Sequence, residues 1–249
     1  MKETEGLEQI YPRPLSGDAV MRLPPALVPT RAILMGQEIQ LEPQDAAKHA
    51  NELYAAGHNS DDGLKIWDYL PYGPWPDIET YKSILRQQSS SVDTIFYTLR
   101  SLKTGKSCGQ TSFMDMHPQN GVIEIGNIWF APEMQKSRSG TEALFLMLHY
   151  AMDDLGYRRM QWRCNSLNKR SRYAARRLGF RFEGIFYNHL IFKGKNRDTA
   201  WYSILDDEWP EVRSIIERWL QPSDFDDGGA PKTSLFQLMQ GRGPSTRGR

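Results

Sequence analysis

The sequence has 249 residues, 39% of them hydrophobic, which is enough for one large core or two small domains. Its 31 basic and 30 acidic side chains give a net charge of +1, so no global field draws the protein to nucleic acid or anionic lipid. The two cysteines lack zinc-ligand spacing and no apolar run resembles a signal peptide or membrane span, so we expect no metal and a cytoplasmic location.

The first part of the chain predicts an arm followed by a domain. Residues 1–30 contain five prolines, which predicts an extended N-terminal arm. Beyond them, strand-like and helix-like patterns alternate without an internal repeat, which predicts one α/β domain over residues 31–221. We expect its first strand over 31–41 and its first helix over 42–56, with Pro43 in the first helical turn.

An aromatic and proline-rich loop follows over residues 66–76. It has too many prolines for a regular element and too much aromatic surface to lie wholly in water, so it either walls a pocket or packs on the core as a lid. Asp77 is typical of a helix cap, and the helix it opens is expected to run to Gln88.

The centre and the end of the domain alternate strands with helices. Gly105 lies in the turn of a predicted hairpin, Gly156 ends a mostly buried helix, and Pro210 opens the last helix. The expected strands are 94–99, 107–113, 122–130, 158–165, 179–187 and 198–205, and the expected helices are 139–155, 168–178 and the one after Pro210. Residues 222–249 predict a flexible C-terminal tail, unless the apolar patch over 235–239 docks on the domain.

The segment most informative for function joins strand 122–130 to the buried helix. It reads Ile128-Trp-Phe-Ala-Pro-Glu-Met-Gln-Lys-Ser-Arg-Ser-Gly-Thr-Glu-Ala143. The first N–H groups of a helix have no internal partner, so with the helix dipole they form a site for a diphosphate, and Lys136 and Arg138 add positive charge. From the residues alone, a solvated connection with chance basic residues is an equal alternative.

This segment resembles the acyl-CoA loop of the GCN5-related N-acetyltransferases (GNAT), whose pattern is Gln/Arg-x-x-Gly-x-Gly/Ala. Gln135 and Gly140 match the pattern, and Arg138 stands where the family usually has its first glycine. A second motif is similar to the closing signature of the ribosomal-protein acetyltransferase branch (RimJ/RimL-type); it reads Cys164-Asn165-x-x-Asn168-x-x-Ser171 and continues to Leu178-Gly-Phe-x-x-Glu183-Gly184. Together with Asp198, the resemblance covers roughly residues 31–220.

The resemblance implies a single GNAT-type domain. Its central sheet would be mixed, mostly antiparallel, flanked by helices and splayed between its fourth and fifth strands, here 122–130 and 158–165, with the pantetheine arm of acetyl-CoA in the gap. Acetyl-CoA is the implied cosubstrate, without a metal. The residues implied to bind it are Ile128, Trp129, Phe130, Gln135, Lys136, Ser137, Arg138, Ser139, Gly140, Thr141, Asn165, Asn168 and Ser171.

The implied reaction is direct transfer of the acetyl group to a primary amine. Glu124 is the candidate base, because a charged amine must lose a proton before it attacks. Ser171 is implied to lie near the thioester sulfur, since the position of the tyrosine acid of many relatives holds Ala175 here. The alternatives are a salt-bridged Glu124, a Ser171 bonded to the preceding helical turn, and an Asn168 that serves only as a helix cap.

The acceptor is expected to be a small-molecule amine or amino acid, with a protein N-terminus as the alternative. Candidate acceptor contacts are Trp67, Tyr69, Tyr72, Trp75 and Glu124. Residues 158–182 hold nine basic and no acidic residues, which leaves a noncatalytic CoA-binding or an RNA- or ribosome-binding module as an alternative of another class. We expect no membrane partner, and family habit implies a homodimer.

Overall fold

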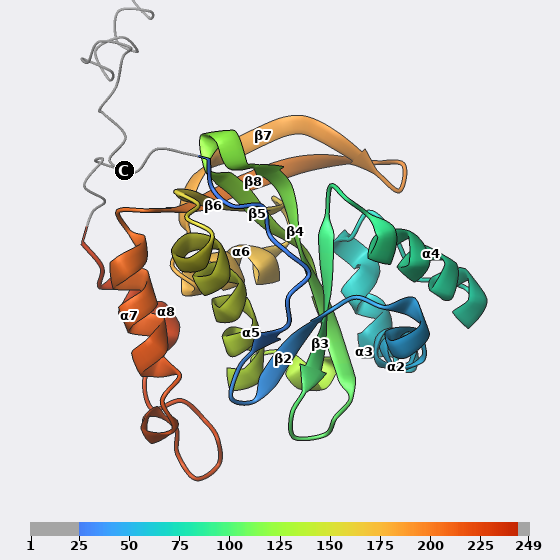
Figure 1. Cartoon of the computed structure of the whole chain (residues 1–249), viewed down its shortest axis with the longest axis horizontal. Coiled ribbons are helices and arrows are strands. Elements are labelled where there is room, and N and C mark those ends of the chain that lie inside the picture. The colour runs from blue at the N-terminus through green and yellow to red at the C-terminus, as the bar shows by residue number, and fades with distance from the viewer. Residues whose placement is uncertain (1–24, 244–249) are drawn as a thin grey trace, which may run out of the picture.

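The computed structural model describes residues 25–243 and has one eight-stranded sheet in the order β1-β2-β3-β4-β5-β6-β8-β7 (Figure 1). The strands are β1 (Leu34–Met35), β2 (Ile39–Pro43), β3 (Ile95–Ser101), β4 (Ser107–His117), β5 (Val122–Phe130), β6 (Arg159–Asn165), β7 (Arg181–Phe192) and β8 (Lys195–Leu205). Only β5 and β6 pair in parallel; every other pair is antiparallel. The predicted mixed, mostly antiparallel sheet is therefore confirmed.

The helices pack on the sheet in two groups, each with its own hydrophobic cluster. The helices are α2 (Ala46–His58), α3 (Asp61–Leu64), α4 (Ile78–Ser90), α5 (Arg138–His149), α6 (Lys169–Arg177), α7 (Trp209–Trp219) and α8 (Leu235–Gln240). A large cluster joins the sheet to α5, α6, α7 and α8, and a smaller one joins α2 and α4 to the aromatic loop and Trp129 (Figure 1). Because strand side chains alternate between faces, Met160, Trp162 and Cys164 of β6 point into the large cluster and their neighbours point the other way.

The sheet opens between β5 and β6, as the resemblance to the acetyltransferase family implies. Only Val122–Glu124 pair with Arg159–Gln161, and beyond this point the two strands separate. The opening was expected between the fourth and fifth strands. These strands are labelled β5 and β6 here because the first expected strand is divided into β1 and β2. The strands therefore part after Glu124, and the place where they are apart is called the gap below, with its narrow end at Glu124.

Two expectations near the start of the domain are wrong. The strand expected over 31–41 is broken by a turn at residues 36–38, because the Glu142 carboxylate on α5 accepts the N–H groups of Gln37 (2.7 Å) and Glu38 (2.9 Å). The first helix begins at Ala46 instead of residue 42, capped by the Asp45 side chain, and Pro43 is the last residue of β2. A proline at a strand end needs no ladder donor, so the local pattern fits both elements.

The strands β7 and β8 are longer than the sequence pattern indicates. The first strand was expected to end at residue 187 and the second to begin at residue 198. Instead, both continue to a two-residue turn, Lys193 and Gly194, in which both residues have positive φ. That conformation suits a type I′ hairpin turn. The hairpin projects past the end of β6 (Figure 1).

The two terminal segments lie against the domain where the structure describes them. In the expected arm, residues 1–24 lie outside the described residues, while Ala26 and Leu27 donate N–H groups to the carbonyls of Pro118 and Leu155. Residues 244–249 of the expected tail also lie outside the described residues, but the part up to residue 243 docks: Leu235 is buried, and Phe236 of α8 stacks on Tyr173 with ring centres 4.8 Å apart. The structure thus favours the docking that the apolar patch left open.

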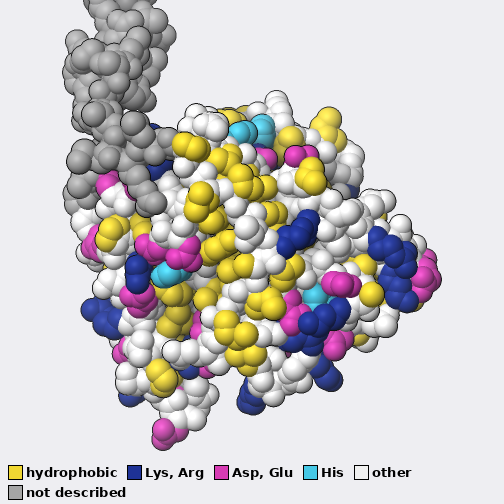
Figure 2. Space-filling model, viewed as in Figure 1, with side chains coloured by type: hydrophobic (Ala, Val, Ile, Leu, Met, Phe, Trp, Pro, Cys, Tyr) yellow, Lys and Arg dark blue, Asp and Glu magenta, His cyan; other side chains and the backbone are white. Residues whose placement is uncertain are grey.

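The surface of one face carries an apolar band. Hydrophobic side chains gather over its middle, where the chain passes from Pro25 into β1 and β2 (Figures 1 and 2). The exposed apolar residues of this segment are Leu27, Val28, Ile33 and Met35. None of the helices within 25–243 has the length and apolarity that crossing a bilayer requires.

Candidate active site

The N-terminus of α5 forms the first part of the site. Ser137 caps the helix: its Oγ accepts the Gly140 N–H (2.9 Å) and donates to the Met134 carbonyl (2.7 Å). Lys136 has a φ of 60°, which turns the loop sharply before the helix. The N–H groups of residues 136–139 meet no acceptor within residues 25–243, and together with the helix dipole they make a concave anion site.

Gly140 is needed where it stands. A Cβ built at this position would lie 2.8 Å from the Met134 carbonyl oxygen and 3.3 Å from the Phe130 ring. The loop and the helix start are therefore packed too closely for a side chain. The Gln135 side chain adds a second constraint, since its Nε2 donates to the Phe130 carbonyl (3.2 Å).

The Arg138 side chain points away from the anion site. Its Nη1 donates to Glu38 (2.6 Å), its Nε donates to the Leu220 carbonyl (2.8 Å), and the guanidinium lies over the Phe225 ring. Arg138 thus joins the start of α5 to the β1–β2 turn and to the end of α7. Its backbone N–H can still face an anion, but its side chain does not reach into the loop.

Two more residues assigned to the loop have structural side chains. The Ser139 Oγ donates to Glu38 (2.6 Å). Thr141 is buried, its Oγ1 donating to the Ser137 carbonyl (3.2 Å) and accepting from Arg177 (2.8 Å). Ser139 could therefore meet an anion only through its backbone N–H, and the Thr141 N–H already donates to the Ser137 carbonyl (3.3 Å).

The β5 side of the gap contains a bulge. The register shifts between Gln110 and Ser112 of β4, and Asn127 opposite them has a φ of 52°. The Asn127 amide is fixed by Ser112 Oγ (2.9 Å) and by the Tyr72 hydroxyl (3.0 Å). A bulge re-aims backbone groups next to the open gap.

The side chains around this bulge divide between the two clusters. Ile128 and Phe130 lean on the large hydrophobic cluster, whereas Trp129 is buried in the small one against Trp67. The exposed edge of β5 in the gap is therefore presented as backbone N–H and C=O groups. Such groups call for a peptide-like partner.

The β6 side of the gap carries the residues of the second motif. Asn165 Oδ1 accepts the Leu167 N–H (2.9 Å), and Asn168 caps α6 by accepting the Ser171 N–H (3.1 Å). The Ser171 hydroxyl accepts from Trp162 Nε1 (3.0 Å), and it also lies beside the Cys164 thiol. The cap expected for Asn168 is present, and Ser171 bonds to a β6 side chain instead of the preceding helical turn.

Glu124 lies at the narrow end of the gap in a buried charged cluster. Its side chain is almost fully buried, its Oε2 is 2.9 Å from Arg163 Nε, and Arg163 also pairs with Asp115. Burial raises the pKa of Glu124 to about 8, with the Asp115 charge acting in the same direction and Arg163 opposing it. A carboxyl with its pKa near neutrality can exchange a proton at physiological pH.

The aromatic loop forms a wall beside the gap. Trp67 is buried, and its indole N–H donates to the Gly57 carbonyl. Tyr72 stacks on Trp75, whose backbone N–H donates to His58 Nε2. Burial raises the pKa of the Tyr72 hydroxyl, which keeps it protonated. Of the aromatic side chains in this loop only Tyr69 is exposed, and its hydroxyl approaches the Leu167 carbonyl at 3.4 Å. Trp67 therefore serves packing, Tyr72 and Trp75 are partly buried in the wall, and Tyr69 alone of these four rings is exposed.

Sequence reasoning missed four residues of the site. Asp115 and Asn127 both have positive φ, a conformation that Asp and Asn tolerate more readily than most residues, but their sequence context does not reveal it. Arg163 shows a weak signal because it alternates with buried residues along β6. Arg197 gives none, since a buried arginine on a hairpin is rare.

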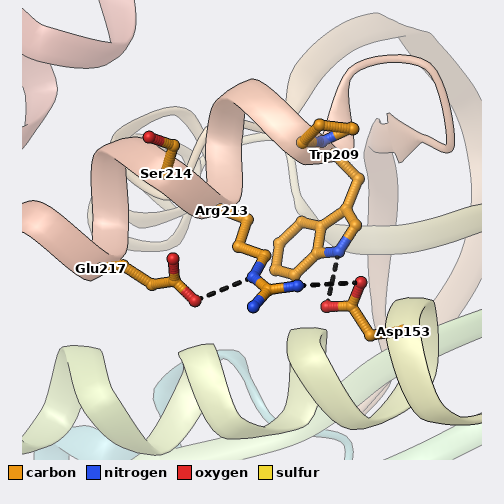
Figure 3. Close-up of a pocket in the computed structure, with 6 residues that line it drawn as sticks. Asp153, Trp209, Arg213, Ser214 and Glu217 are labelled. Carbon is orange, nitrogen blue, oxygen red and sulfur yellow. Dashed lines mark hydrogen bonds and ion pairs between the residues drawn. The ribbon is translucent and has the colours of Figure 1, made fainter.

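Two hollows of the surface lie away from this site. One, of about 260 Å³, lies where α7 meets the π-helical turn Tyr150–Asp154 at the end of α5 (Figure 3). Figure 3 shows Arg213 reaching both Asp153 and Glu217, with the Trp209 indole donating to Asp153 (2.9 Å). The other, of about 720 Å³, lies between α2 and α4. The charged groups of the hollow in Figure 3 pair with one another.

Comparisons with known proteins agree on one family. A family model described as "Acetyltransferase (GNAT) domain" matches residues 39–181. A crystal structure of a GCN5-related N-acetyltransferase from Brucella melitensis is 40% identical, covers 89% of this chain and 100% of its own, and has a TM-score of 0.86. YdaF of Bacillus subtilis (strain 168), provisionally named a ribosomal N-acetyltransferase, is 28% identical over 173 residues, which are 68% of this chain and 90% of YdaF. The microcin C7 self-immunity acetyltransferase MccE, solved with acetyl-CoA and AMP, is 25% identical with a TM-score of 0.57, covering 68% of this chain and 93% of its own.

Proposed function

This chain belongs to the GNAT acetyltransferases, enzymes that use acetyl-CoA to acetylate amines, and we propose that its acceptor is the primary amine of a small molecule or amino acid. The acetyl group would pass directly to the acceptor while both substrates are bound. The fold alone does not select an acceptor within such a family. The proposal therefore depends on the groups around the gap.

The observation that carries the proposal is the pairing of an open backbone edge with an anion site. The edge of β5 beyond Glu124 offers unpaired peptide groups, which suit the amides of pantetheine. The N–H groups of residues 136–139 suit the diphosphate, and Gly140 lets the loop approach the helix closely. The residues present thus fit acetyl-CoA, which supplies an activated acetyl thioester when bound.

Glu124 and Ser171 are the groups proposed to act on the reacting atoms. Glu124 would accept the proton of the incoming amine, directly or through a water molecule, because its carboxyl has a pKa of about 8. Ser171 would donate its hydroxyl proton toward the thiolate that leaves, since its Oγ already accepts from Trp162 and keeps its own hydrogen free to turn. Asn168 holds the start of α6 and so fixes Ser171 in place.

A protein N-terminus is the second candidate acceptor. The provisional name of YdaF, a ribosomal N-acetyltransferase, favours it. Against it, the aromatic loop and the β7–β8 hairpin meet: Lys193 Nζ donates to the Trp67 carbonyl at 2.7 Å. A mouth narrowed in this way favours a small acceptor over a folded protein end.

The nine basic residues of 158–182 give little support to an RNA-binding role. Six of the nine side chains have partners within the domain: Arg159 with Glu183, Arg163 with Glu124, Arg172 with Tyr202, Arg176 with Phe236, Arg177 with Thr141 and Arg181 with Glu208. Charges used in this way do not form a continuous track for phosphates.

The homodimer that the family resemblance implies stays a prediction.

Calorimetric titration with acetyl-CoA, followed by a thiol-release screen over amino acids, polyamines, aryl amines and short peptides, tests the proposal. We expect saturable binding and release with one class of small amine. Release with peptides alone would select the N-terminal acceptor. Binding of acetyl-CoA without release of free CoA would indicate a noncatalytic CoA-binding protein. Strongly salt-dependent binding of RNA, without binding of acetyl-CoA, would indicate the RNA- or ribosome-binding module.

A further inference from the structure

Arg197 is a buried cation that makes no ion pair within the part of the chain that the structure describes. Its side chain belongs to β8, is only 8% exposed, and places its guanidinium over the Phe192 ring at 4.4 Å. Its Nε is buried without an acceptor, and within residues 25–243 no carboxylate pairs with it. A buried charge is costly unless it is paired, so this position favours an anion from outside.

The surrounding charges do not remove the imbalance. Arg163 is the other cation of the cluster, and it is already paired with Glu124 and Asp115. Glu124, with its pKa of about 8, is mostly protonated at pH 7. Burial lowers the pKa of Arg197 and Arg163 acts in the same direction, while the Cys164 thiol and Glu124 oppose them. The cluster therefore keeps about one excess positive charge at neutral pH.

Arg197 lies at the wide end of the gap, on the face that holds Glu124. Asn165 at the end of β6 pairs with Thr199, and the Ser166 N–H donates to the carbonyl of Asp198, the residue next to Arg197. Alternation along β8 puts Arg197 on the same face as Trp201, over which the Arg163 guanidinium lies.

Two contacts close this end of the gap into a mouth. Lys193 at the tip of the hairpin donates to the Trp67 carbonyl, and the Tyr69 hydroxyl approaches the Leu167 carbonyl. Arg197 therefore belongs to a hairpin that Lys193 joins to the aromatic loop and that the Asp198 carbonyl joins to the β6–α6 loop.

We propose that Arg197 binds the carboxylate of the acceptor, so that the enzyme acetylates the amine of free amino acids in preference to amines without an acid group. The inference rests on the proposed function and specifies its substrate class. A guanidinium can hold a carboxylate through two parallel hydrogen bonds, which fixes orientation as well as charge. With the acid held at Arg197, the amine would be directed toward Glu124 at the narrow end.

The test compares each free amino acid with its carboxamide in the thiol-release assay, at saturating acetyl-CoA. For the wild type we expect kcat/KM for the free acid to exceed that for the amide by about tenfold to a hundredfold. Arg197→Met should abolish this preference mainly through KM, and Arg197→Lys should keep part of it. Lys195→Gln, on the exposed end of the same hairpin, is the matched control and should keep the wild-type preference.

A binding readout separates failure of the inference from failure of the proposed function. With CoA present, free N-acetyl amino acids should raise the melting temperature of the wild type and of Lys195→Gln, but not that of Arg197→Met. Equal rates with acid and amide, while transfer still occurs, would overturn the role of Arg197 and leave the function intact. If transfer occurs only to peptides, and best to a peptide with an aspartate side chain, the acceptor is not a free amino acid and the proposal is also overturned. Absence of transfer to every amine would refute the function itself.

Discussion

Replacing Glu124 by glutamine tests the proposed base most directly. The change keeps the shape of the side chain but removes the group that accepts a proton. Because burial outweighs the Arg163 pairing and holds the pKa at about 8, about one tenth of the molecules carry the carboxylate at pH 7. The wild-type kcat/KM should therefore rise nearly tenfold per pH unit up to pH 7 and level off above about pH 8.

In the Glu124→Gln variant, turnover should fall by about 10² to 10⁴ and the limb of the pH profile centred near 8 should disappear. Amine acceptors themselves titrate near pH 10, so the variant must be compared with the wild type on the same acceptor across the same pH range. Glu79→Gln, on the exposed side of α4, is a matched control that should keep both rate and profile. Unchanged kinetics in Glu124→Gln would remove this residue from the mechanism.

The same substitution has a consequence for stability. A carboxyl whose pKa rises from 4.5 to about 8 on folding binds its proton more tightly in the native state. That contribution is complete below pH 4.5 and is lost as the pH rises through 8, with an upper limit on the order of 5 kcal/mol. Denaturant unfolding at pH 5 and pH 9 should show this loss in the wild type and a smaller one in the variant. If the free energy of unfolding falls by the same amount between pH 5 and pH 9 in both proteins, the carboxyl has an ordinary pKa.

Three further substitutions test the gap and its loop. Gly140→Ala should weaken acetyl-CoA binding by about tenfold or more, because the added methyl meets the Met134 carbonyl at 2.8 Å, and an unchanged calorimetric Kd would contradict the packing argument. Ser171→Ala should lower kcat more than acetyl-CoA affinity, whereas a pure binding defect in titration would make it a binding residue. Arg138→Ala should cost about 1–3 kcal/mol in urea unfolding, because Glu38 and the Leu220 carbonyl lose their donor, and a stability equal to wild type would show that these contacts contribute nothing.

The sequence predicts best those elements that local pattern alone controls. The strand Val122–Phe130 matches its predicted bounds, Asp77 caps α4, and Gly156 takes a left-handed conformation at the helix end. Alternation and caps depend on near neighbours, so they can be read from a short window. The family motifs added the splay, which depends on how β5 and β6 pair.

What the sequence could not predict depends on contacts between distant residues. Glu142 divides the first strand by bonding to a turn more than a hundred residues away, and Arg138 reaches to Glu38 and Leu220. The pKa of Glu124 depends on burial and on Asp115, which a strand pattern does not show. For the same reason, the unpaired charge of Arg197 became apparent only once the charges around it were in place.

The way in which Arg138 replaces a glycine has a consequence for how the substrate is captured. A glycine-rich loop is flexible when empty, and a ligand that orders it loses affinity to the entropy of that ordering. Here the loop is fastened from outside by three contacts that do not involve the ligand. The anion site therefore exists before binding, so acetyl-CoA can enter and leave a rigid site without first ordering the loop.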